Sequence, residues 1–94
     1  MAKLEEWRGA LGMRYTVVWL PVATAKLAML WNQASDRQAV ADAADRLDII
    51  LRDDPESKGR PVGTFFAFDA APLSVLYRVD PADRMVTVVR VMRI

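Results

Sequence analysis

Hydrophobic and polar positions along the chain predict one strand, two helices and then three more strands. Residues 14–20, RYTVVWL, are rich in β-branched and aromatic side chains, which favour a strand. Their continuous apolar character predicts a central strand of a sheet. Pro21 ends this strand and suits the first turn of a helix, where its missing N–H is not needed. We expect that helix to run to about Gln33.

Each expected helix carries an apolar stripe. In the first helix the stripe is formed by Leu27, Leu30 and Trp31, which we expect in the core. Ser35 followed by Gln38 fits a capping box and predicts the start of a second helix, which ends by residue 53. Its stripe consists of Val40, Ala43, Ala44, Leu47, Ile50 and Leu51. The short connection predicts an antiparallel helical hairpin that a sheet must cover.

After a loop rich in Pro and Gly, the second half of the chain alternates with the period of a strand. Residues 64–69, 73–79 and 84–93 are expected to be strands. Asp80, Pro81, Ala82 and Asp83 match a type I turn between the last two. The order β-α-α-β-β-β predicts an α+β fold, an antiparallel four-stranded sheet with the N-terminal helical hairpin packed on one face. This domain spans residues 14–94, and residues 1–13 form an N-terminal extension, in which Leu4, Trp7 and Leu11 have helical spacing.

The sheet face opposite the hairpin is expected to be open to partners. If Asp80 and Asp83 close the turn, Val75 faces Val88 and Tyr77 faces Val86 on the core side. The open face then carries Phe65, Ala67, Ser74, Leu76, Arg78, Met85, Thr87, Val89, Val91 and Arg93. An exposed apolar surface of this extent is typical of a protein interface. The candidate partner-binding residues are therefore Phe65, Leu76, Met85 and Val89.

Composition limits the chemistry. The 94 residues contain no Cys and no His, which excludes disulfides, cysteine nucleophiles, serine triads and most zinc sites. Asp42, Asp45 and Asp48 repeat along a helix, and we interpret them as a solvated face rather than a metal site. Tyr77 is interpreted as a packed aromatic side chain rather than an acid or base. We expect no metal and no cofactor.

The net charge and the hydropathy of the chain indicate which partners it can bind and where in the cell it is expected. The net charge of +1 is too small to indicate nucleic-acid binding by itself, although residues 1–56 carry −2 and residues 57–94 carry +3. No apolar run reaches the roughly 20 residues that span a bilayer. Glu5 and Glu6 lie where a signal peptide would be apolar. We therefore expect a cytoplasmic protein without a membrane partner.

Three segments carry a family resemblance: RYTVVWLPVA at residues 14–23, RLDIILRDDPESKGRPVG at residues 46–63 and LSVLYRVDPADRMVTVVRVMRI at residues 73–94. Together with the order of the elements, they resemble the RelE/ParE superfamily of bacterial toxins over nearly all of residues 14–94. The resemblance implies the toxin of a type II toxin–antitoxin system, neutralised by a cognate antitoxin protein that wraps it. Members of the superfamily either cleave mRNA on the ribosome or inhibit DNA gyrase.

The resemblance to the mRNA-cleaving branch is weak at its site residues. In that branch, basic residues occupy the positions that correspond to Phe65 and Ala67 or lie near them. An arginine of that branch occupies the position that corresponds to Ser74. Only the arginine near the end of the last strand has a counterpart, in Arg90 or Arg93, and the C-terminal tyrosine has none. A nuclease would use Arg78, Arg90 and Arg93 as its candidate catalytic residues.

The gyrase-inhibiting branch resembles the expected apolar open face better. Three alternatives therefore stay open: a toxin that binds gyrase or another essential protein, a ribosome-dependent mRNA endonuclease, and a non-toxic relative that keeps only antitoxin binding.

Overall fold

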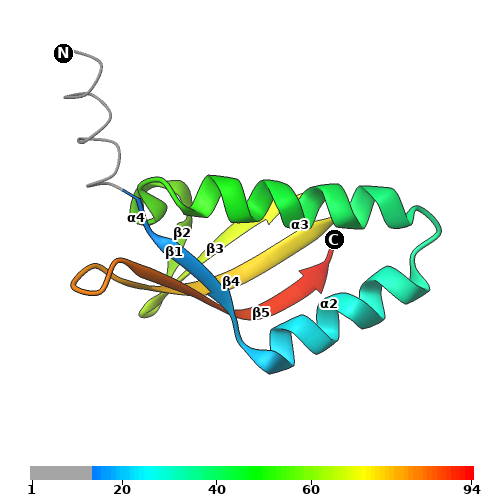
Figure 1. Cartoon of the computed structure of the whole chain (residues 1–94), viewed down its shortest axis with the longest axis horizontal. Helices are drawn as coiled ribbons and strands as arrows, with labels where there is room; N and C mark the ends of the chain where they lie inside the picture. The colour runs from blue at the N-terminus through cyan, green and yellow to red at the C-terminus, as the bar shows by residue number, and fades with distance from the viewer. Residues whose placement is uncertain (1–13) are drawn as a thin grey trace, which may run out of the picture.

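A sheet of five strands in the order β1-β5-β4-β3-β2 organises residues 14–94, the part of the chain that the computed structural model describes. The strands are β1 (Thr16–Trp19), β2 (Arg60–Val62), β3 (Phe65–Ala70), β4 (Leu73–Asp80) and β5 (Met85–Arg93). The helices are α2 (Pro21–Gln33), α3 (Arg37–Leu51) and the short α4 (Pro55–Lys58). Helices α2 and α3 form a hairpin over the sheet (Figure 1). The expected N-terminal extension at residues 1–13 lies outside the described residues.

The α+β class is confirmed, but the expectation of four antiparallel strands is wrong. The sheet has five strands and is mixed, because β1 pairs with β5 in parallel while the other pairs are antiparallel. Strand β1 is an edge strand rather than a central one. Its side chains alternate between more buried and more exposed, and Val18 is 37% exposed. An apolar residue on the outer face therefore made the strand resemble a central one.

Helix α2 begins at Pro21 and ends at Gln33, as its pattern predicts. Its residues Ala23 and Leu30 are buried. Trp31 is 41% exposed, so its prediction as a core residue is wrong. The guanidinium carbon of Arg37 lies 4.8 Å from the centre of the Trp31 ring, which gives this exposed indole a cation–π partner.

Helix α3 starts one residue later than the capping box predicts. The N-cap is Asp36, whose Oδ1 accepts a hydrogen bond of 3.0 Å from the Ala39 N–H. The Gln38 side chain donates instead to Asp42, so the expected box of Ser35 and Gln38 is absent. The predicted stripe lies against the sheet, and its buried members are Val40, Ala43, Leu47 and Leu51.

The hairpin between β4 and β5 closes two residues later on β5 than expected. Asp80 pairs with Met85, not Asp83, because the connecting loop includes Arg84 in a left-handed conformation with φ of 52°. Tyr77 pairs with Val88, and the next residue on β4, Leu76, pairs with Arg90. Val89 has no opposite residue and forms a β-bulge. The two-residue error keeps each side chain on its expected face as far as the bulge.

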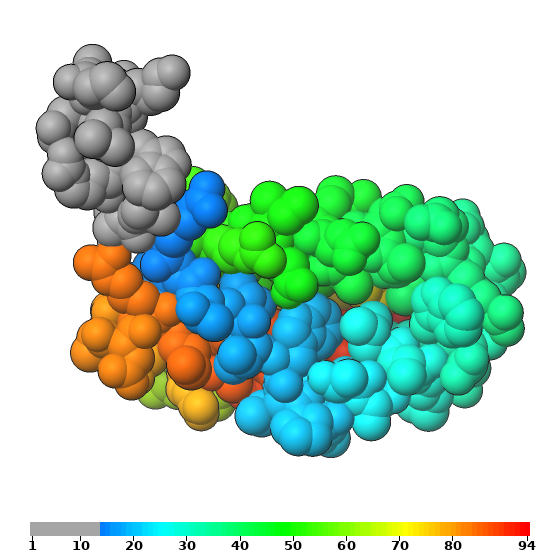
Figure 2. All heavy atoms as spheres, in the orientation of Figure 1, coloured from blue at the N-terminus to red at the C-terminus, as the bar shows by residue number. Residues whose placement is uncertain are grey.

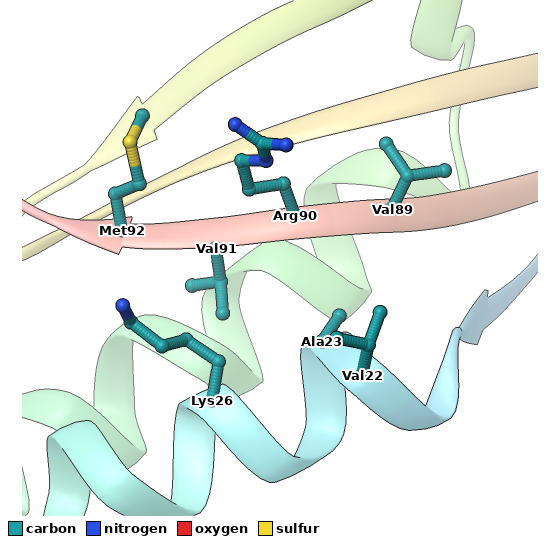
Figure 3. Close-up of a pocket in the computed structure, with 7 residues that line it drawn as sticks. All are labelled: Val22, Ala23, Lys26, Val89, Arg90, Val91 and Met92. Atoms are coloured by element: carbon teal, nitrogen blue, oxygen red, sulfur yellow. The ribbon is translucent and has the colours of Figure 1, made fainter.

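Beyond the bulge the faces are exchanged relative to the prediction. Val91 is 1% exposed and packs in the core, and Arg93 pairs with the fully buried Leu73. The expectation that Val91 and Arg93 lie on the open face is therefore wrong. Arg90 and Met92 point away from α2 in their place (Figure 3).

Tyr77 ties the sheet to the segment that follows α3. Its side chain is fully buried, its ring stacks on Phe66 with centroids 5.7 Å apart, and its hydroxyl donates a hydrogen bond of 2.7 Å to the Pro55 carbonyl. The interpretation of Tyr77 as a packed aromatic is confirmed. A Cβ atom at Gly59 would overlap the Tyr77 hydroxyl and lie 3.0 Å from the Ala67 carbonyl oxygen. The close approach of this loop to the sheet thus depends on the absence of a side chain at position 59.

The substitution Gly59→Ala should destabilise the fold by about 1–3 kcal/mol, the usual cost of overpacking a core. Its effect can be measured as the free energy of unfolding in urea. Gly63→Asn is the matched control, because Gly63 has φ of 62°, which Asn tolerates, and a Cβ there would meet nothing within 4 Å. An equal loss of stability in both variants would contradict this explanation.

Candidate protein-binding face

The sheet surface that faces away from α2 and α3 is called the open face here. Strand alternation and the pairing register place on it side chains from all three long strands. They are Phe65, Ala67, Asp69, Ser74, Leu76, Arg78, Met85, Thr87, Val89, Arg90 and Met92. All four candidate partner-binding residues, Phe65, Leu76, Met85 and Val89, lie on this face as the sequence predicts.

The middle of the open face is apolar. Leu76 on β4 lies opposite Ala67 on β3 and opposite Arg90 on β5. Phe65, Ala67, Leu76 and Val89 are half-buried, which leaves part of each side chain in solvent. Met85 is 37% exposed and Met92 is 47% exposed. Burying these side chains under a partner would release further apolar surface from water, which is the main driving force for protein association.

Two edge strands add apolar residues that sequence patterns did not find. Val62 on β2, which pairs with Phe65, is 48% exposed, and Val18 on β1, which pairs with Thr87, is 37% exposed. The three residues of β2 lie in a segment rich in Pro and Gly, so this part of the sequence has no alternation of apolar and polar residues that would predict a strand. The open face is wider than predicted for this reason.

One corner of the open face is polar and internally paired. The Asp69 carboxylate accepts a hydrogen bond of 2.7 Å from the Ser74 hydroxyl, and a guanidinium nitrogen of Arg60 lies 3.5 Å from its other oxygen. The hydrogen bond from Ser74, helped by Arg60, lowers the pKa of Asp69 below its usual value. Asp69 is therefore an ionised acceptor and not a proton donor at neutral pH.

The three candidate catalytic arginines do not converge. Arg78 and Arg90 are exposed on the open face, with Arg90 opposite Leu76. Arg93, at the end of β5, pairs with Leu73 and belongs by alternation to the helix-covered side. Neither Arg78 nor Arg90 has a hydrogen-bond or ion-pair partner among residues 14–94.

The described residues offer little else for a metal or for proton transfer. Among residues 14–94 no cluster of three or more acidic side chains is arranged to hold a metal ion. Asp48 accepts a hydrogen bond of 3.1 Å from the Trp19 indole N–H, which gives this acidic residue of α3 a structural role. No helix in this part of the chain is long and apolar enough to cross a membrane.

Comparisons with known proteins find the fold of this chain in two solved structures. No family model and no curated protein matches the chain. A chain in the crystal structure of the RelBE2 toxin–antitoxin complex from Mycobacterium tuberculosis matches with a TM-score of 0.74 and 22% identity, over 87% of this chain and 93% of that one. The protein described here therefore shares the fold of that chain. A chain of the chromosomal ParDE system from P. aeruginosa matches with a TM-score of 0.71 and 19% identity, over 88% and 98% of the two chains.

The buried phenol of Tyr77 should make the stability of the core beneath this face depend on pH. Burial raises its pKa from 10.0 to about 12. Above pH 10 the unfolded chain loses a phenol proton that the folded chain keeps, so the stability contributed by the neutral phenol is lost as the pH rises from 10 to about 12.

The free energy of unfolding in urea should therefore fall more steeply above pH 10 in the natural chain than in Tyr77→Phe. Lysine titration affects both chains equally, so the difference reports Tyr77. Parallel pH curves for the two chains would contradict the burial of an ionisable phenol.

Proposed function

We propose that this chain is the toxin of a bacterial type II toxin–antitoxin module. It inhibits growth by binding an essential cytoplasmic protein such as DNA gyrase through the open face, and a cognate antitoxin neutralises it. Two independent observations support membership in the RelE/ParE superfamily. The three sequence segments resemble it, and the fold matches the RelBE2 and ParDE structures over most of both chains.

The apolar character of the open face is the observation that carries the choice of a protein target. Leu76 and Val89 are half-buried near its middle, and two partly exposed methionines, Met85 and Met92, lie along β5. Methionine side chains adapt to the shape of a partner. Arg78 and Arg90 fit the same interpretation, because arginine is enriched at protein interfaces. The face therefore combines an apolar centre with a few cations.

Cleavage of mRNA is a less suitable function for this arrangement. It needs groups that stabilise negative charge on a phosphate and groups that move a proton. The open face offers Arg78 and Arg90 for the first task. The carboxylate of Asp69 is held by Ser74 and Arg60, and the Tyr77 phenol is fully buried, so neither supports the second.

Growth assays with charged substitutions test the proposal. Leu76→Asp and Phe65→Asp should each restore growth of bacteria that express the chain without an antitoxin. Each change places a charge in an apolar contact, where loss of a central side chain costs about 2–4 kcal/mol, or about 30-fold to 1,000-fold in affinity. Ile49→Asp is the matched control, because Ile49 is 64% exposed on α3, away from the open face. This variant should stay toxic.

Circular dichroism and thermal unfolding of the purified variants would show that the two open-face variants still fold. Toxicity that survives both Leu76→Asp and Phe65→Asp would overturn the proposed surface. If the natural chain then cleaved mRNA and the combined change of Arg78, Arg90 and Arg93 to Ala abolished that cleavage, the ribosome-dependent endonuclease would replace the protein-binding toxin. Absence of growth inhibition by the natural chain would leave the third alternative, a relative that only binds an antitoxin.

A further inference from the structure

A groove lies between α2 and α3 on the surface of the helical hairpin. Its volume is about 540 Å³, and its lining includes Leu27 and Trp31 of α2 and Ala41 and Ala44 of α3. Figure 2 views the molecule from the side on which these helices lie, with α2 in cyan and α3 in green. The Trp31 side chain is 41% exposed. The groove therefore presents apolar surface from two helices to the solvent.

Two side chains of opposite charge lie at this groove. The exposed Asp45 is part of its lining. Arg37 has its guanidinium carbon 4.8 Å from the centre of the Trp31 ring and donates a hydrogen bond of 3.3 Å to the Asn32 carbonyl. These two contacts position the Arg37 cation beside the groove. Within residues 14–94 neither Arg37 nor Asp45 has an ion-pair partner, so each charge is available to a group on another molecule.

The two charges are arranged symmetrically about Ala41. Arg37 precedes Ala41 by about one helical turn and Asp45 follows it by about one turn, which puts all three residues on one side of α3. Around a twofold axis beside Ala41, the α3 helix of a second copy runs antiparallel to the first. Arg37 of each copy then lies opposite Asp45 of the other. Ala41 and Ala44 are small, which allows the two helix backbones to approach closely.

We propose that two copies of this chain form a symmetric dimer through the groove between α2 and α3, with the twofold axis beside Ala41. A twofold dimer requires a self-complementary surface, because the same residues meet from both copies. Two ion pairs between Arg37 and Asp45 align the copies, and Trp31 is buried between them, as aromatic side chains often are at interfaces. This inference goes beyond the proposed function and does not depend on it, because the oligomeric state can be measured on a chain without toxicity.

Analytical ultracentrifugation of the full chain over a range of protein concentrations tests for the dimer. The natural chain should sediment as a reversible dimer. Asp45→Arg should weaken dimerisation at least about tenfold, because it places two cations opposite each other at both ends of the contact. Asp42→Arg is the matched control, since it makes the same change of charge at an exposed position of α3 that does not line the groove. This control should leave dimerisation unchanged.

Exchange of the two charges between copies tests the pairing itself. Arg37→Asp alone should weaken dimerisation, as Asp45→Arg does. A mixture of the two variants should form mixed dimers, because each reversed residue again meets an opposite charge on the other copy. The chain that carries both changes should dimerise like the natural chain. Within one copy the two positions are about two helical turns apart, so restored dimers report a contact between copies and also show that the variants fold.

A natural chain that stays monomeric at its highest soluble concentration would overturn the proposal. Equal dimerisation of the Asp45→Arg and Asp42→Arg chains would also overturn it, because the copies would then meet at another surface. The same holds if either the mixture or the doubly changed chain fails to dimerise. The growth assay changes Leu76 and Phe65 on the opposite side of the sheet, so failure of this inference and failure of the proposed function are separable.

Discussion

The bulge at Val89 decides which side chains of β5 reach each face of the sheet. Before it, Val86 and Val88 point into the core, and after it Val91 does so, because one additional residue shifts the alternation. Without this shift Arg90 would point into the apolar core and Val91 into solvent. The burial of Val91 under α2 and the position of Arg90 on the open face thus depend on one irregularity in β5.

The two ends of β5 consequently serve different surfaces. Its first part lies between β1 and β4, where Met85 contributes to the apolar open face. Its second part lacks the β1 neighbour and forms the free edge beside α2. Residues 89–93 are thus paired with β4 on one side and have no strand on the other.

The elements that depend on local pattern were predictable from the sequence. Pro21 fixes the start of α2, and the apolar spacing from Val40 to Leu51 fixes the buried side of α3. The parallel pairing of β1 with β5 was not predictable in this way, because it joins the two ends of the described chain and no local pattern encodes it. The start of α3 at Asp36 was missed because Ser35 and Asp36 are both good caps, and only the backbone geometry chooses between them.

The face of the sheet on which each candidate residue lies was predicted correctly as far as the bulge. Phe65, Leu76, Met85 and Val89 lie on the open face because a two-residue error in the hairpin preserves alternation. Arg93 was misplaced because the bulge was not recognised. The sequence held a signal, since strict alternation after Val86 and Val88 would place Arg90 in the core.

Pulse labelling of DNA and protein synthesis tests the central claim most directly. Bacteria would be labelled in the minutes after the natural chain is induced without an antitoxin. A toxin that binds gyrase through the open face stops DNA synthesis first, while protein synthesis continues. A fall in protein synthesis that precedes any change in DNA synthesis, together with cleaved mRNA, would contradict this account.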